Sequence, residues 1–436
     1  MMKTFKKGGV HPHAEKLTAD VAVAELPAPA EIALPLSQCI GAPARPLVKA
    51  GDEVEAGQMV AEAGGFVSAP VHSPVAGKVK KIDKVRNPQG LWQDAIIITV
   101  DAEKASEAPQ PRTQAEVDAL EPSEIVGIIG EAGVVGLGGA TFPTRVKLTP
   151  PEGKVADLIV INGAECEPYL TCDDLLMRSN AREIILGTRL LMRSVGVKEA
   201  VIGIEENKPE AIEAMRNASM NYTDIDVVEL KKKYPQGGEK QLIQALTGRE
   251  VPMGGLPVDV GCIVDNVATA YAVYQAVYER CPLTRRIVTV TGPGLSNPGN
   301  FLVPFGTPLT ALIEAAGGLP EDTGKIIAGG PMMGRAVSDL DSPSTKGLSG
   351  IVVLPRSQSE RKPEGPCLRC AKCVAACPMG LEPYLLMLLA KRGDWETAQA
   401  RQVMGCIECG CCSFTCPSNR PILDYIKLTK MNLRKR

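Results

Sequence analysis

The chain has 436 residues, enough for three or four domains rather than one hydrophobic core. Its formal net charge of −2 gives no reason to expect nucleic acid as a partner, and no apolar run approaches the roughly 20 residues that a membrane helix needs. The first residues lack the apolar stretch of a secretory signal, so we expect the 14 cysteines in a reducing cytosol, where they favour metal or redox chemistry over disulfides.

Residues 30–100 are rich in Gly and Pro, with short β-like runs separated by turns. This rhythm resembles that of lipoyl and biotinyl carrier domains, flattened β-sandwiches that present a modifiable lysine at a hairpin tip. The corresponding tip here reads EAGGFV, from Glu62 to Val67, and contains no lysine. We therefore predict a barrel-sandwich module over residues 1–105 that carries no group, followed by a polar linker.

A glycine-rich stretch, GVVGLGGATFPTRVKL, runs from Gly133 to Leu148. Closely spaced glycines let backbone N–H groups approach a phosphate or a flat ring without obstruction by a Cβ atom. The stretch is not the dinucleotide motif G-x-G-x-x-G, which follows a strand and opens a helix. On the glycines alone, a simple tight turn is an equal alternative.

From residue 120 to 282, strand-like and helix-like runs alternate. The strands are expected in ADLIVIN, EAVIGIEE and DIDVVEL, and the helices in NAREIILGTRLLMRSVG, KPEAIEAMRNAS, GGEKQLIQALTG and DNVATAYAVYQAVYER. This alternation predicts a Rossmann-like α/β domain whose parallel sheet is covered on both faces. Residues 284–355 predict a small sheet packed on one helix, and a polar linker, PRSQSERKPEGP, follows.

Two cysteine runs follow the pattern C-x-x-C-x-x-C-x-x-x-C-P. The first run contains Cys367, Cys370, Cys373 and Cys377, and the second contains Cys406, Cys409, Cys412 and Cys416. In two-cluster ferredoxins the cysteine before proline ligates the other cluster. The expected 4Fe–4S ligand sets are therefore Cys367, Cys370, Cys373 with Cys416, and Cys406, Cys409, Cys412 with Cys377. Cys411 is an extra thiol outside the pattern.

Two structural zinc sites are the alternative, because paired C-x-x-C motifs could supply four ligands each. The repeated triplet followed by Cys-Pro is more specific for 4Fe–4S clusters. The spacer GLEPYLLMLLAKRGDWETAQARQ has helical periodicity. We therefore predict a helical ferredoxin-type domain with two clusters over residues 363–426.

Four segments, in order, resemble the NADH-oxidising subunit of respiratory complex I: GLGGATFPTRVK, NGAECEP, YPQGGEKQL and DNVATA. The whole arrangement, with KGGVHP near the start and YPQGGEKQLIQALTGREVP, resembles the C subunit of the Rnf electron-transport complex. That resemblance implies a β-grasp (SLBB-like) domain at 284–355, non-covalent FMN and NADH as hydride partner. It also implies a peripheral position on the cytoplasmic side of the bacterial inner membrane. The partners would be other subunits, including an iron–sulfur subunit, and ferredoxin indirectly.

The same resemblance implies roles for individual residues. The FMN phosphate side and neighbouring NADH would be held by Gly136, Gly138, Gly139 and Lys147, and Phe142 would stack near the nicotinamide or adenine. Polar groups of the flavin would be reached by Asn162 and Glu165, and the nucleotide would be faced by Glu167 and Glu239. The pocket would be completed by Tyr234, Gly237, Asn266 and Thr269. The chain departs from the complex I pattern at Leu137, Ala164 and Gly238. Taken alone, Phe142 is better explained as a core aromatic, and Glu167 and Glu239 as solvated surface charges.

The expected chemistry divides a two-electron transfer into one-electron steps, because a flavin takes up a hydride and iron–sulfur clusters accept single electrons. The flow could also run from ferredoxin to NAD. No catalytic acid or base is required. Two alternatives are a flavin and iron–sulfur cobalamin reductase of a bacterial microcompartment, and a non-enzymatic electron conduit. The turns TGPGLSNPGN and AGGPMMG and the three histidines are interpreted as structural.

Overall fold

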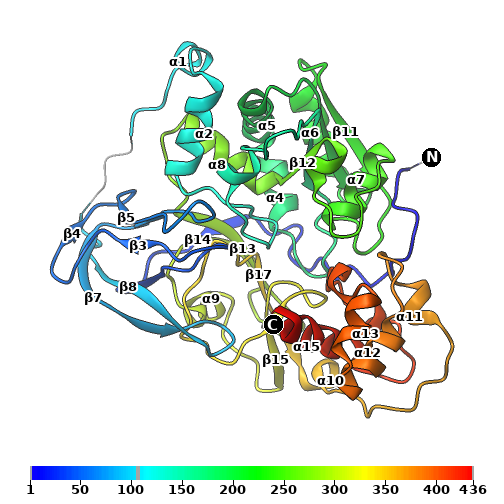
Figure 1. The fold of residues 1–436 in the computed structure, drawn as a ribbon. Helices are drawn as coiled ribbons and strands as arrows, with labels where there is room; N and C mark the ends of the chain where they lie inside the picture. Colours follow the sequence, from blue (N-terminus) through cyan, green and yellow to red (C-terminus); the bar gives the residue numbers. More distant parts are fainter. Residues whose placement is uncertain (1, 105–108, 435–436) are drawn as a thin grey trace.

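The computed structural model describes residues 2–104 and 109–434 and shows four parts (Figure 1). A β module lies beside a helix-covered α/β domain, a second sheet with one helix lies below them, and a helical C-terminal domain lies to the side (Figure 1). The predicted linker after the β module falls partly on residues 105–108, outside the described residues.

The barrel-sandwich module is built from two small sheets, as its turn-rich sequence predicts. One sheet has the order β2-β8-β7-β4 and the other β3-β5-β6. Their bounds are β2 Glu31–Pro35, β3 Arg45–Pro46, β4 Glu53–Val54, β5 Met59–Glu62, β6 Val71–His72, β7 Gly77–Arg86 and β8 Trp92–Val100. Ile32, Leu34, Val60, Ile96 and Ile98 are fully buried in the core of the module.

Residues 2–26 fold elsewhere, although the predicted module begins at residue 1. Phe5 packs in the core of the α/β domain with Leu230 and Leu242. Strand β1 (Val23–Glu25) adds to the second sheet by pairing in parallel with β14 (Gly299–Pro304). This segment carries isolated apolar residues without a period of their own, so its sequence does not reveal which core they complete.

The α/β domain has the predicted parallel sheet, in the order β11-β10-β9-β12. Its strands are β9 Leu158–Gly163, β10 Ala200–Glu205, β11 Ile225–Leu230 and β12 Cys262–Asn266. Its α-helices are α1 Gln114–Asp118, α2 Pro122–Glu131, α3 Thr144–Lys147, α4 Cys172–Ser179, α5 Ala181–Val195, α6 Pro209–Ser219, α7 Glu239–Thr247 and α8 Val267–Val277. Helices α5 and α8 bury one face of the sheet, and α7 with Phe5 buries the other.

One predicted boundary in this domain is wrong. The run DNVATAYAVYQAVYER was predicted as helix from its first residue, but Asp265 and Asn266 end strand β12 and α8 begins at Val267. The change of direction places Asn266 at the carboxyl end of a central strand, beside the end of β9. In open α/β sheets this edge is the usual place for a ligand.

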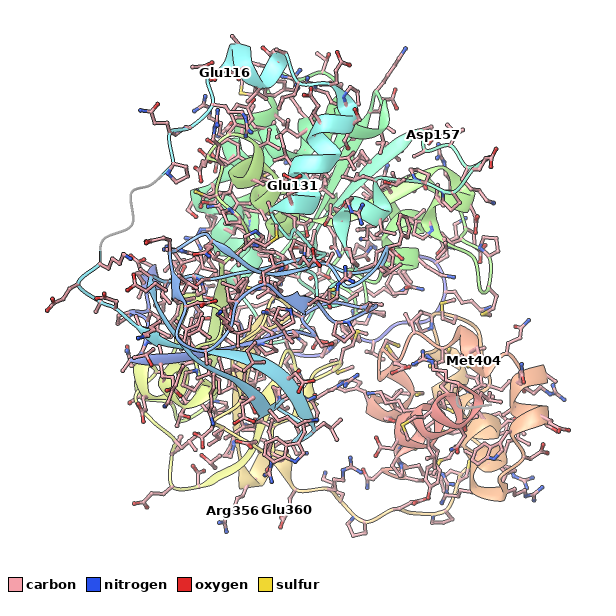
Figure 2. The ribbon with its side chains drawn as sticks, turned by 60° about the vertical axis from the view of Figure 1, so that its left-hand side comes forward. Glu116, Glu131, Asp157, Arg356, Glu360 and Met404 are labelled. Carbon is pink, nitrogen blue, oxygen red and sulfur yellow. The ribbon has the colours of Figure 1, made fainter. Side chains whose placement is uncertain are left out.

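The second sheet has the order β1-β14-β13-β17-β15-β16 and packs on the helix α9 (Leu309–Ala315). Its remaining strands are β13 Arg285–Thr291, β15 Thr323–Ala328, β16 Arg335–Ala336 and β17 Gly350–Pro355. The predicted polar linker starts as a short helix, α10 (Arg356–Ser359). Figure 2 shows the chain leaving this sheet at Arg356 and Glu360 and crossing to the helical domain that carries Met404.

The C-terminal domain is helical, as its spacer predicted. Its α-helices are α11 Lys372–Ala375, α12 Pro383–Arg392, α13 Trp395–Ala400, α14 Cys411–Phe414 and α15 Ile422–Arg434. Leu386, Met387, Val403, Ile422 and Ile426 form its buried core. Within residues 2–104 and 109–434, the structure contains no helix with the length and apolarity to cross a bilayer.

Three of the parts meet at a buried lysine. The ammonium group of Lys346 donates to the carbonyl oxygens of Pro70 (2.8 Å) and Gly133 (2.7 Å), and so joins the second sheet to the β module and the α/β domain. His72 is buried beside it. Burial, with repulsion from Lys346, lowers the pKa of His72 to about 3.

We expect this histidine to make the protein acid-sensitive. Below pH 6.5 the unfolded chain protonates His72 while the folded chain does not, so its contribution to stability is present above that pH and is lost as pH falls towards 3. Over this range the free energy of unfolding falls by about 1.4 kcal/mol for each pH unit. Thermal unfolding at pH 7.5 and 5.5 should show a smaller acid shift for His72→Gln than for the wild type. Equal shifts of the unfolding temperature in the variant and the wild type would show that His72 does not cause the acid sensitivity.

Candidate functional site

The glycine-rich loop lies at the carboxyl edge of the parallel sheet. Its ends are held together by Gly136 N–H donating to the Phe142 carbonyl oxygen (2.9 Å), and Leu137 N–H donates to the hydroxyl of Thr269 in α8 (2.9 Å). Gly139 has φ +110°, and a Cβ there would meet no atom within 4 Å. The loop therefore presents exposed backbone beside the N-terminus of α8, with free space at Gly139.

Two asparagines from adjacent strands meet at this edge. Asn266 accepts the Ala268 N–H (2.9 Å) as the cap of α8, and its amide donates to the Asp173 carboxylate (2.7 Å). Asn162 donates to the carbonyl oxygen of Gly237 (2.9 Å). A Cβ on Gly237 would lie 3.4 Å from the Asn162 side-chain oxygen, at the near limit of ordinary van der Waals contact. Asn162, Gly237 and Asn266 are thus brought together.

Lys147 and Asp265 form a largely buried ion pair behind the loop. The Lys147 ammonium donates to the Val264 carbonyl oxygen (2.6 Å) and lies 3.3 Å from the Asp265 carboxylate. Burial raises the pKa of Asp265, and its second carboxylate oxygen has no hydrogen-bond partner among the described residues. Glu239 begins α7 nearby, and burial raises its pKa as well.

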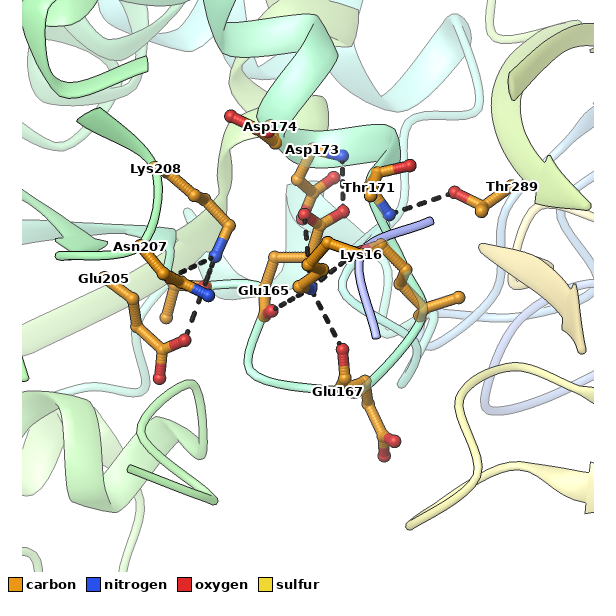
Figure 3. Close-up of polar contacts among 12 residues, drawn as sticks. Lys16, Glu165, Glu167, Thr171, Asp173, Asp174, Glu205, Asn207, Lys208 and Thr289 are labelled. Carbon is orange, nitrogen blue, oxygen red and sulfur yellow. Dashed lines mark hydrogen bonds and ion pairs between the residues drawn. The ribbon is translucent and has the colours of Figure 1, made fainter. Parts of the chain in front are cut away.

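A cluster of buried charges fixes the loop after β9 (Figure 3). Lys16 donates to the carbonyl oxygens of Glu165 (3.0 Å) and Glu167 (3.1 Å), and Lys208 donates to that of Ala164 (2.7 Å). The Glu165 carboxylate accepts the Asp173 N–H (2.7 Å). Burial raises the pKa of Asp173 to about 6. Sequence reasoning missed Lys16, Lys208 and Asp173, because no recognised motif contains the two lysines and the aspartate lies just beyond the NGAECEP segment.

Two predicted pocket residues have other contacts in the structure. The Glu167 carboxylate, expected to face the nucleotide, accepts the N–H groups of Met332 (2.9 Å) and Met333 (2.8 Å) from the second sheet. Tyr234, expected to complete the flavin pocket, is buried and donates its hydroxyl to the carbonyl oxygen of Cys409 (2.9 Å). Both residues link segments of the α/β domain to other domains, which a local motif cannot reveal.

The two cysteine runs differ in exposure. Cys367 and Cys370 are exposed, whereas Cys409 and Cys412 are buried. Burial raises the pKa of Cys412 to about 12, with added repulsion from Cys406, Cys409 and Cys377. The neighbours of Cys412 therefore include Cys377 of the first run.

Cys416 shows the reverse arrangement. Burial raises the pKa of Cys373, and Cys416 of the second run adds repulsion. The Cys411 sulfur approaches the backbone of Tyr234 instead (3.9 Å). The exchanged ligand sets predicted from the Cys-Pro pattern agree with these neighbours.

The spacing of the sulfurs can be compared with that of a zinc site. A tetrahedral zinc site with Zn–S distances of about 2.3 Å places its sulfurs about 3.8 Å apart. In the described part of the chain, no three sulfurs of the two runs lie within 4.8 Å of one another.

The open glycine loop, the α8 N-terminus and Lys147 fit a phosphate-bearing ligand.

Three family models match the chain. They are the RnfC barrel sandwich hybrid domain over residues 3–103, the Nuo51 FMN-binding domain over residues 129–275, and the SLBB domain over residues 287–336. These matches confirm the predicted barrel-sandwich, flavin-binding α/β and β-grasp parts.

Relatives match over the whole chain, and all three named here are C subunits of ion-translocating complexes. That of the proton-translocating ferredoxin:NAD(+) oxidoreductase complex of Clostridium ljungdahlii is 44% identical, covering 100% of this chain and 95% of the relative. Its Na(+)-translocating counterpart from Acetobacterium woodii is 41% identical, covering 99% and 97%. That of the ion-translocating oxidoreductase complex of Rhodobacter capsulatus is 42% identical, covering 99% and 83%.

Among solved structures, an NAD+-reducing [NiFe]-hydrogenase in the H2-reduced state resembles the chain with a TM-score of 0.49 and 18% identity. The match covers 76% of this chain and 67% of that chain.

Proposed function

Because this chain belongs to the RnfC family, the C subunits of ion-translocating ferredoxin:NAD+ oxidoreductase (Rnf) complexes, we propose that it passes electrons between NADH, FMN and two 4Fe–4S clusters, toward or from ferredoxin. It is an oxidoreductase subunit, and ion transport belongs to its partners in the complex. The observation that carries the proposal is the arrangement of an FMN-type domain directly against the second cysteine run.

The chain's own groups suit a bound flavin nucleotide. Lys147 and the N-terminus of α8 supply positive charge for a phosphate, and Gly138 leaves room beside Asn266. The amides of Asn162 and Asn266 bind Gly237 and Asp173 and so fix these groups at the edge where a polar ring would lie. When bound, the flavin supplies a group that accepts a hydride and releases electrons singly. We assign Gly136, Gly139, Phe142, Glu165, Glu239 and Thr269 to the same pocket as lining or support.

Burial supports a proposed order of the two clusters. Tyr234 and Cys166 lie between the flavin side and Cys409, since Gly237 N–H donates to the Cys166 sulfur (3.3 Å) and Tyr234 contacts Cys409. Cys367 and Cys370 are exposed. Electrons are therefore proposed to pass from the flavin to the second-run cluster and then to the first-run cluster, which faces a partner.

That partner is proposed to be an iron–sulfur subunit of the same membrane complex, with ferredoxin reached through it. The chain is proposed to sit peripherally on the cytoplasmic side of the bacterial inner membrane, held there by other subunits. The relatives named above do not support the cobalamin-reductase alternative. The open glycine loop and the match to an FMN-binding domain argue against the alternative of an electron conduit without flavin.

Purified, reconstituted protein should contain FMN and about eight iron atoms per chain, two cubanes' worth. Adding NADH anaerobically should bleach the flavin absorbance and then that of the clusters. Titration of flavin-free protein with FMN would restore the bleaching. Protein that bleaches with NADH without any flavin, or that binds FMN and never bleaches, would overturn the proposal.

A further inference from the structure

A turn of the SLBB domain reaches into the space between the flavin site and the second cysteine run. Residues 329–334, GGPMMG, connect β15 to β16. Gly334 N–H donates to the Gly330 carbonyl oxygen (2.8 Å), and Gly329 N–H donates to that of Gly350 (2.7 Å). The sequence identified this stretch only as a β-turn, but its tip contacts two other domains.

Glu167 clamps one side of the turn. Its two carboxylate oxygens accept the N–H groups of two consecutive residues, Met332 and Met333, which is a bidentate grip on the backbone. A Cβ on Gly330 would clash with the Glu167 carboxylate, so glycine permits this approach. The Glu167 backbone is held in turn by the buried Lys16. The turn is thus tied to the same loop that approaches the flavin site.

On its other side the turn packs, through Met332, against the second cysteine run. The Met332 side chain packs in a small cluster with Tyr234, Cys409 and Cys411. Its carbonyl oxygen lies so near Gly410 that a Cβ there would be 3.0 Å away, and Gly410 has φ +81°. Met333 is not part of this cluster, and 48% of its surface is exposed. The two adjacent methionines therefore occupy opposite environments on one clamped turn.

We propose that Met332, on the turn clamped by Glu167, is a positioning residue for electron transfer: it fixes the distance between the flavin site and the Cys409–Cys411 segment. This rests on the proposed function. The step transfers one electron from the reduced flavin to the oxidised second-run cluster, with no bond made or broken. Its rate falls exponentially with distance, so a small relaxation of the segment slows it while leaving hydride transfer unchanged.

Rapid mixing with NADH tests this in the reconstituted full chain. Met332→Ala should leave the rate of flavin bleaching unchanged and slow cluster bleaching several-fold, as the exponential dependence on distance implies for a small displacement. Met332→Leu, which refills the space, should restore most of the rate. Met333→Ala is the matched control and should leave both rates unchanged. Iron and FMN contents, measured for each variant, should equal those of the wild type.

Glu167→Gln separates the clamp from the nucleotide role implied by resemblance. Loss of one N–H acceptor should slow only cluster bleaching, whereas slower flavin bleaching would assign Glu167 to the nucleotide and contradict the clamp. Wild-type cluster rates in both Met332→Ala and Glu167→Gln would overturn the proposal, as would equal slowing in Met333→Ala. A wild-type protein that never bleaches with NADH fails the proposed function instead.

Discussion

Cys377→Ala should abolish NADH-driven reduction of both clusters, although Cys377 belongs to the first cysteine run. Its buried thiol lies among Cys406, Cys409 and Cys412, so with the exchanged ligand sets proposed here its loss would remove the fourth ligand of the second-run cluster. If that cluster stands between the flavin and the first run, the remaining cluster is cut off from the flavin, and NADH should no longer reduce it at a measurable rate. A small reductant such as dithionite should still reduce it.

Cys416→Ala is expected to remove the other cluster. It should remove the exposed first-run cluster, halve the iron content, and leave NADH reduction of the second-run cluster at the wild-type rate. Cys411→Ala should keep all iron, since Cys411 contacts the Tyr234 backbone and stands outside the ligand pattern. Electron paramagnetic resonance of each variant identifies the surviving cluster. Loss of the first-run cluster in Cys377→Ala would refute the exchanged ligand sets.

Lys147→Met should both destabilise the α/β domain and abolish FMN binding. Asp265 is fully buried, and Lys147 is the cation that compensates it. Removing one partner of such a pair costs about 3–5 kcal/mol, because a buried charge is left without compensation. The lost positive charge also weakens the hold on the phosphate. Thermal unfolding and FMN titration measure the two effects.

A second substitution separates the two consequences. In Lys147→Met with Asp265→Asn, the buried charge is gone, so most of the lost stability should return, while FMN binding should stay weak. Recovery of FMN binding in the double variant would show that Lys147 acts only through Asp265. Unchanged stability in the single variant would contradict the pairing.

Sequence patterns predicted the four parts of the fold because each part has its own period of apolar residues or its own spacing of turn-forming residues. The alternation around Ile159 and Ile202 predicted a parallel sheet, and the Cys-Pro pattern predicted the pairing of Cys377 with the second run. Contacts between domains were not predictable. Glu167 and Tyr234 lie in motifs that identify their residue types, but their partners come from segments far along the chain. Lys16 carries no motif at all.

The N-terminal segment has a consequence for biosynthesis. Phe5 completes the α/β core, a Cβ on Gly8 would clash with the backbone of Cys377, and β1 joins the SLBB sheet. At 5–20 residues per second, a ribosome makes Cys377 roughly 20 to 75 seconds after Gly8. The contact between Gly8 and Cys377 therefore cannot form until the helical C-terminal domain has been made, whereas Phe5 and β1 can dock on the parts completed before it.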